Sequence, residues 1–112
     1  MEKSTSEMYI SVDIETSGPN PSRYSILSIG ACTVFEPVEI FYVEFKPISM
    51  DAKADALKIS KLSMERLIET GVEPETGMRE FTDWLERVVP DGKKPVFVAF
   101  NAPFDWMFVN DY

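Results

Sequence analysis

The stretch SVDIETSGPN (residues 11–20) decides the fold, because it ends a strand and begins a loop. Over residues 8–15, apolar side chains alternate with polar or amphipathic ones, which is the period-two pattern of a strand with one buried face. The following SGPNPS (residues 17–22) is rich in residues that favour turns. Residues i and i+2 of a strand share a face, so we expect Asp13 and Glu15 to lie side by side at its end.

The rest of the chain predicts an α/β fold with a mixed sheet. Further strands are expected at residues 25–35, 38–45 and 95–100, helices at residues 51–59, 64–70 and 74–89, and a last helix that begins after Pro103. Short connections between the first three strands favour an antiparallel meander, and a helical crossover then brings in the fourth strand parallel to an earlier one. The fourth run, PVFVAF, is continuously apolar, which is typical of a central strand covered on both faces.

Composition narrows the chemistry that the chain can perform. Eleven Lys and Arg against nineteen Asp and Glu give a net charge of −8, so the summed field of the chain repels phosphate unless a bound divalent metal ion reverses it locally. The absence of histidine excludes Ser-His and Cys-His nucleophilic chemistry and His-ligated zinc. There is no membrane-length apolar run and no signal region, so we expect a cytoplasmic protein with no membrane partner.

Three carboxylates are candidates for a metal site. Asp13 and Glu15 repel each other unless they are solvated or bridged by a cation, and their hard oxygen atoms suit Mg²⁺ or Mn²⁺. Asp105 follows the fourth strand, and the carboxyl ends of parallel neighbouring strands meet at one end of a sheet. Two alternatives stand beside this hypothesis. In the first alternative, Asp13 and Glu15 only point into water. In the second, Asp105 is an ordinary acid that stabilises a helix N-terminus.

Two short motifs carry a resemblance to a known family. DIETSG and, after the fourth strand, AFNAPFDWMF resemble the DEDD-type 3′–5′ exonucleases, which include proofreading exonuclease subunits and ribonuclease T. The D-x-E-T motif falls on Asp13, Glu15 and Thr16, and the N-x-x-F-D motif falls on Asn101, Phe104 and Asp105. The segment ALKISKLSMERL between them is similar to a helical stretch of the family. The resemblance covers nearly the whole chain and implies a ribonuclease H-like fold.

The resemblance also implies a role for each matched residue. Asp13 is implied to bridge two Mg²⁺ or Mn²⁺ ions, Glu15 to bind one of them near the terminal 3′-OH, and Asp105 to hold the second. The implied partner is the 3′ end of a single-stranded nucleic acid, DNA or RNA. Contacts with its terminal nucleotide are expected from Ile14, Thr16, Ile26 and Phe104, with Asn101 supporting the site. An alternative for Phe104 is a core position, paired with Phe108 one helical turn later.

The chain departs from the family pattern after the second motif. The family's third motif, a His followed by an Asp on a later helix, has no counterpart, and neither do a fifth strand and the closing helix. We therefore interpret residues 1–112 as an incomplete, truncated ribonuclease H-like exonuclease domain, with residues 1–7 as a flexible leader. The expected function is metal-dependent hydrolysis of phosphodiester bonds from the 3′ end by the complete enzyme, with little activity in this chain alone.

Two further expectations follow from this departure. The rival function is a catalytically inactive ribonuclease H-like module that acts in binding or assembly. Without a fifth strand, residues 95–100 become an edge of the sheet, and unprotected apolar edges recruit another strand. A homodimer through this edge, or through the last helix over residues 105–112, is therefore predicted.

Overall fold

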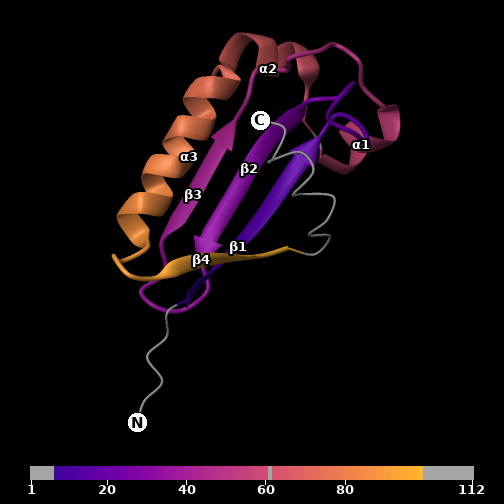
Figure 1. Ribbon diagram of the computed structural model, residues 1–112. Coiled ribbons are helices and arrows are strands. Elements are labelled where there is room, and N and C mark those ends of the chain that lie inside the picture. Colours follow the sequence, from indigo (N-terminus) through magenta and orange to yellow (C-terminus); the bar gives the residue numbers. More distant parts are fainter. Residues whose placement is uncertain (1–6, 61, 100–112) are drawn as a thin grey trace.

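The computed structural model describes residues 7–60 and 62–99, which form one sheet with helices packed against it (Figure 1). The elements are, in chain order, β1 (Glu7–Thr16), β2 (Ile26–Thr33), β3 (Ile40–Glu44), α1 (Ala54–Ser60), α2 (Met64–Thr70), α3 (Pro74–Val88) and β4 (Lys94–Val98). Every strand and helix predicted before residue 100 is therefore present; α2 has the predicted bounds, and the other elements have shifted ends. β1 begins at Glu7, inside the predicted leader, whereas the rest of that leader and the predicted last helix lie outside the described residues.

The sheet is mixed and has the strand order β3-β2-β1-β4. β1 pairs with β2, and β2 with β3, in antiparallel fashion, whereas β4 pairs with β1 in parallel. The predicted meander and the predicted parallel fourth strand are both confirmed. The parallel register joins Glu7 to Lys94 and Ser11 to Val98, so β4 runs in the direction of β1 and ends beside Ser11.

α3 covers one face of the sheet and closes the main hydrophobic core. Phe81 and Trp84 of this helix pack against buried side chains of the strands, namely Ile10, Val12, Ile14, Ile26, Ile29, Ala31 and Val43. The helix approaches the sheet closely because Gly77 has no side chain. A Cβ at Gly77 would overlap the ring of Phe45 and come within 3.0 Å of Val72 Cγ2.

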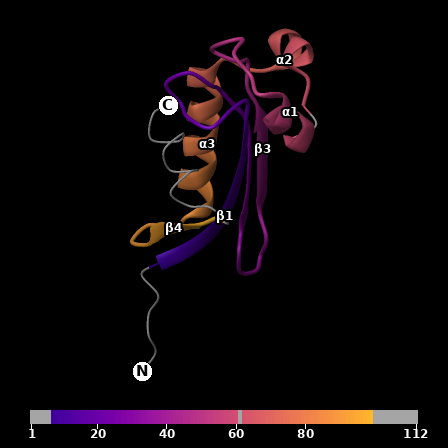
Figure 2. The same cartoon turned by 90° about the vertical axis from the view of Figure 1, so that its right-hand side faces the viewer.

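α1 and α2 lie on the opposite side of the strands from α3, near the end of the sheet where β1 stops (Figure 2). A second, smaller core joins them to the sheet and consists of Leu27, Met64 and Leu67. The hydroxyl of Ser63 accepts a hydrogen bond from the N–H of Arg66 and so caps the N-terminus of α2. Within the described ranges, the helices are too short or too polar to cross a membrane.

β4 corrects the expectation of a strand covered on both faces. It lies at an edge of the described sheet, and four of its five residues are exposed. Phe97 contacts Phe81 of α3, with the ring centroids 6.3 Å apart, yet Phe97 remains 41% exposed. A continuously apolar strand is buried only where neighbouring elements cover it. Among the described residues, β4 has one neighbouring strand, β1, on one of its two sides. The predicted edge is thus confirmed for residues 95–98.

Candidate active site

Asp13 and Glu15 lie on the face of β1 that is turned away from α3. Val12 and Ile14, which alternate with the two acids, point into the core, and this alternation leaves Asp13 exposed and Glu15 partly buried. The two Cα atoms are about 7 Å apart along the strand, which allows two carboxylates to reach a shared cation. The pairing register shifts directly after Glu15, so regular pairing of β1 is interrupted where the second acid stands.

Small residues of β2 oppose both acids. Gly30 pairs with Asp13, and Ser28 pairs with Glu15. Gly30 leaves the sheet face beside Asp13 open, whereas Ser28 is 3% exposed and Glu15 is partly buried, so the face is covered around the second acid. On the next strand, β3, Tyr42 pairs with Gly30 and Glu44 pairs with Ser28.

The pair Tyr42 and Glu44 was not predicted as part of the site. The hydroxyl of Tyr42 donates a 2.7 Å hydrogen bond to Oε2 of Glu44. Partial burial and this hydrogen bond raise the pKa of Tyr42 above its usual range, and the charges of Glu44 and Glu15 act in the same direction, whereas a hydrogen bond with Ser28 opposes them. The alternation along β3 is visible in the sequence, but the register that brings Tyr42 into the row of Asp13 is not.

Two buried serines hold the loop that follows the acids, and they too were missed. The hydroxyl of Ser17 accepts a 2.9 Å hydrogen bond from the N–H of Ser25, and the N–H of Ser17 donates to the carbonyl of Ser25. The hydroxyl of Ser25 in turn accepts from the amides of Ile48 and Ser49, at 3.0 and 3.2 Å. Both serines are fully buried. The chain after β1 is therefore tied to the segment that follows β3.

The remaining residues that the resemblance singles out fall into two groups. Ile14 and Ile26 are buried in the main core, and Thr16 is buried with its hydroxyl donating a 2.9 Å hydrogen bond to the carbonyl of Gly18. Their contacts with a terminal nucleotide stay predictions. The residues of the second motif lie outside the described residues, so the structure does not place Asn101, Phe104 or Asp105.

The described residues supply part of the ligand set for a divalent metal ion. Within residues 7–60 and 62–99, no three Asp, Glu or Cys side chains are grouped so that they could hold an ion. Asp13 and Glu15 offer two carboxylates, which are the donors that Mg²⁺ and Mn²⁺ prefer. β4 ends beside Ser11 and runs parallel to β1, so the chain leaves it toward the end of the sheet that carries the acids. The donor chemistry fits a divalent ion, with Asp105 as the predicted third ligand.

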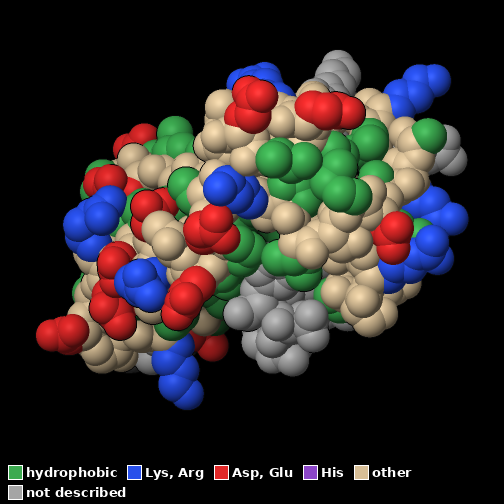
Figure 3. Space-filling view, turned by 90° about the horizontal axis from the view of Figure 1, so that it is seen from above, with side chains coloured by type: hydrophobic (Ala, Val, Ile, Leu, Met, Phe, Trp, Pro, Cys, Tyr) green, Lys and Arg blue, Asp and Glu red, His purple; other side chains and the backbone are tan. Residues whose placement is uncertain are grey.

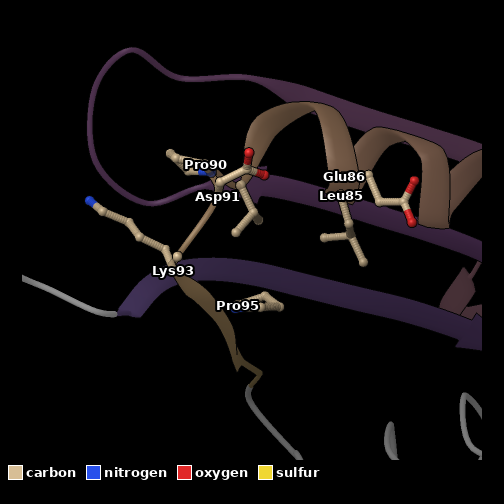
Figure 4. A pocket seen from close by; sticks show the side chains of 8 residues that line it. Leu85, Glu86, Pro90, Asp91, Lys93 and Pro95 are labelled. Carbon is tan, nitrogen blue, oxygen red and sulfur yellow. The ribbon is translucent and has the colours of Figure 1, made fainter.

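Two surface hollows differ in their distance from these acids. One lies on the open sheet face and is lined by Asp13 together with Gly30, Cys32, Ile40 and Tyr42. The other lies between the end of α3 and the start of β4 and is lined by Leu85, Pro90, Lys93 and Pro95, among others (Figure 4). Pro95 pairs with Met8, about 17 Å along β1 from Asp13, so the second hollow is remote from the candidate site.

The charge distribution at the carboxyl end of β1 is mixed. Seen from above, acidic and basic side chains are interspersed, with hydrophobic patches between them (Figure 3). With a net charge of −8 over the whole chain, this surface does not attract a polyanion by itself. A nucleic acid that binds beside Asp13 and Glu15 therefore needs a cation between its phosphates and the carboxylates.

Comparisons with known proteins give a sequence relative and several solved structures with a similar fold. No family model matches the chain. The 3′-5′ DNA exonuclease Cap18 of Escherichia coli is 48% identical over 106 residues, which are 95% of this chain and 57% of Cap18. This chain thus spans a little over half the length of that relative.

Solved structures share the fold at lower sequence identity. Exonuclease I of E. coli, in complex with a dT13 oligonucleotide, superposes with a TM-score of 0.75 at 17% identity, over 92% of this chain and 22% of exonuclease I. Exonuclease X in complex with 5′ overhanging duplex DNA gives a TM-score of 0.63 at 17% identity, over 91% of this chain and 54% of exonuclease X. The order of the sheet and the 48% identity to a named exonuclease together confirm the resemblance of this chain to the DEDD-type 3′–5′ exonucleases and its ribonuclease H-like fold.

Proposed function

We propose that this chain carries part of the active site of a metal-dependent 3′–5′ exonuclease that acts on the 3′ end of single-stranded DNA. The observation that carries the proposal is the pair Asp13 and Glu15, which share the face of β1 turned away from α3 and have the small residues Gly30 and Ser28 opposite them. DNA is preferred to RNA because the relative with 48% identity is named a DNA exonuclease. A cytoplasmic location belongs to the same proposal.

The proposed mechanism gives the described residues positioning and charge roles. Asp13 is the more exposed acid and has Gly30 opposite it, so its carboxylate would be accessible to a divalent ion. Glu15 is partly buried, so its carboxylate has less freedom and suits a fixed ligand near the terminal 3′-OH. Divalent ions, when bound, lower the pKa of the attacking water and clamp the scissile phosphate. The buried contacts of Thr16 and Ser17 fix the turn that follows these acids.

Metal binding tests the site in this chain without requiring turnover. We expect calorimetry to detect weak Mn²⁺ binding by the 112-residue chain and a clear loss of affinity in Asp13→Asn, which keeps the size of the side chain and removes its charge. Asp83→Asn, an exposed position on α3, is the matched control and should bind Mn²⁺ like the unchanged chain. Equal Mn²⁺ affinity for Asp13→Asn and the unchanged chain would remove Asp13 from its proposed role.

Hydrolysis tests the reaction itself. A 5′-labelled single strand should shorten stepwise from its 3′ end in Mn²⁺ or Mg²⁺ and stay intact in EDTA. The assay is run with the 112-residue chain and with the same chain extended by any coding sequence that follows it, and we expect strong activity only in the extended form. Asp13→Asn should lower that rate by on the order of 10²-fold or more, because the charge stabilisation at the phosphate is lost. Binding without metal-dependent shortening in either form would favour the inactive binding module.

A further inference from the structure

We propose that Tyr42 is a stacking platform for a base of the bound strand, placed two strands across the sheet from Asp13. This inference rests on the proposed function and adds a residue that holds the substrate. Tyr42 stands on β3 and is 59% exposed, so most of its ring faces outward. It lines the same hollow as Asp13, together with Gly30, Cys32 and Ile40. An exposed aromatic ring beside a candidate catalytic acid calls for a ligand with a flat, uncharged face.

Gly30 keeps the path between Asp13 and Tyr42 clear. The register places Gly30 opposite Asp13 on β2 and opposite Tyr42 on β3, so the three residues form one row. A Cβ at Gly30 would lie 3.7 Å from Cδ1 of Tyr42, an ordinary van der Waals distance, so the ring of Tyr42 lies beside the glycine. Two strand spacings separate Asp13 from Tyr42, or about 10 Å between Cα atoms. This distance is comparable to the span from a phosphate to the base of the same or the next nucleotide.

The ring of Tyr42 is held in place before any ligand arrives. Its hydroxyl donates a 2.7 Å hydrogen bond to Glu44, two residues along the same strand. A ring fixed in this way loses little conformational freedom when a base stacks on it. Stacking on an aromatic side chain is also tolerant of base identity, since every base has a π-face. Both properties suit an enzyme that removes successive nucleotides.

The acidic surroundings favour a base over a phosphate at this position. Asp13 lies in the same cross-strand row as Tyr42, and Glu15 and Glu44 lie in the neighbouring row. A phosphate placed over the ring without a cation is repelled by these carboxylates, whereas an uncharged base is not. The geometry therefore points to a strand whose phosphate lies at the metal ligands while its base lies over Tyr42.

Tyr9 offers a matched control on the same face. Its hydroxyl also donates to a glutamate two residues away, Glu7, at 3.2 Å. It lies on β1 four residues before Asp13, its ring packs edge-on against Phe35 at 6.2 Å, and it does not line the hollow beside Asp13. Tyr9 thus shares the residue type and the hydrogen-bond pattern of Tyr42 but not its place beside the acids.

The test is a double-mutant cycle between the ring and the base, read as DNA binding. The dissociation constant of a labelled single strand is measured with Ca²⁺ replacing Mg²⁺, in the same two forms of the protein as the hydrolysis assay. Tyr42→Leu should weaken binding by roughly 5- to 150-fold, and Tyr42→Phe, which keeps the ring, should stay within about threefold. Tyr9→Leu should bind like the unchanged protein. With a strand that carries abasic sites near its 3′ end, the unchanged protein and Tyr42→Leu should bind equally.

Two failures are distinguishable. If the unchanged protein binds and shortens DNA but Tyr42→Leu binds normal strands as tightly, or loses as much affinity for abasic strands, the stacking role of Tyr42 is overturned while the exonuclease proposal stands. If no form of the unchanged protein binds a single strand, both proposals are overturned. Thermal unfolding of each variant shows whether it is folded, and Tyr42→Gln, which also removes the ring, replaces Tyr42→Leu should that variant fail to fold.

Discussion

At the scale of single residues, the site depends on side chains that the sequence pattern does not single out. Asp13 and Glu15 are found from alternation and spacing, because a strand places residues i and i+2 on one face. Ser25 carries no such signal, since its partners Ile48 and Ser49 lie more than twenty positions away in the chain. Local pattern therefore predicted the acids but not the contacts that fix the loop behind them.

Ser25→Ala should destabilise the protein. The hydroxyl of Ser25 accepts hydrogen bonds from the amides of Ile48 and Ser49, and the side chain is fully buried. Its removal leaves two amides without this acceptor, so we expect the free energy of unfolding to fall by about 1–3 kcal/mol, measured by urea denaturation. Ser22→Ala is the control: Ser22 is exposed and bonds to Asn20 beside it, so the change should stay within about 0.5 kcal/mol. Equal stability of the two variants would contradict the role of Ser25.

At the scale of elements, the sequence predicted which segments form helices and strands better than where they end. The helix predicted over residues 51–59 begins at Ala54 instead. Asp51 pairs with Arg23 at 3.1 Å, and the N–H of Lys53 donates to the carbonyl of Ser17 at 2.7 Å. These tertiary contacts hold residues 51–53 outside the helix, and helix propensity does not include them. The burial of β4 was mispredicted for a similar reason, because it depends on neighbours in the sheet.

Gly77→Ala tests how closely α3 packs on the sheet. Alanine favours a helix over glycine by about 1 kcal/mol, so an exposed position would gain stability. At Gly77 the new Cβ would overlap the ring of Phe45, which is fully buried and cannot move aside freely. Overpacking of this kind costs about 1–3 kcal/mol, so we expect a net loss of stability and a lower midpoint of thermal unfolding. Thr76→Ala, on the exposed side of the same helix, is the control and should not lower the midpoint. A raised midpoint for Gly77→Ala would show that the helix can shift away from Phe45.

At the scale of the whole molecule, the described sheet has two edges that differ in protection. β4 begins with Lys94 and Pro95, a charge and a residue without an N–H, and both discourage pairing. Its second half carries no charge, and Phe97 and Val98 are 41% and 47% exposed. β3 forms the other edge, where Ile40 is 74% exposed. The end of β3 is covered in part, because the carbonyl of Glu44 accepts a hydrogen bond from the N–H of Val72. Within the described residues, β4 and the first part of β3 are the edges open to a second copy of the chain.

We expect self-association through β4, because in the described sheet the uncharged stretch from Val96 to Val98 has no strand on its outer side and carries apolar side chains. Sedimentation velocity at rising micromolar concentrations should show a dimer. Val98→Lys places a charge on that edge and should shift the equilibrium toward monomer. Ile40→Lys makes the same change on the opposite edge and should leave the dimer intact. Loss of the dimer in Ile40→Lys alone would move the contact to β3. A chain that stays monomeric, with the amides of Val96 and Val98 protected from hydrogen exchange, would mean that β4 is already covered within a single molecule.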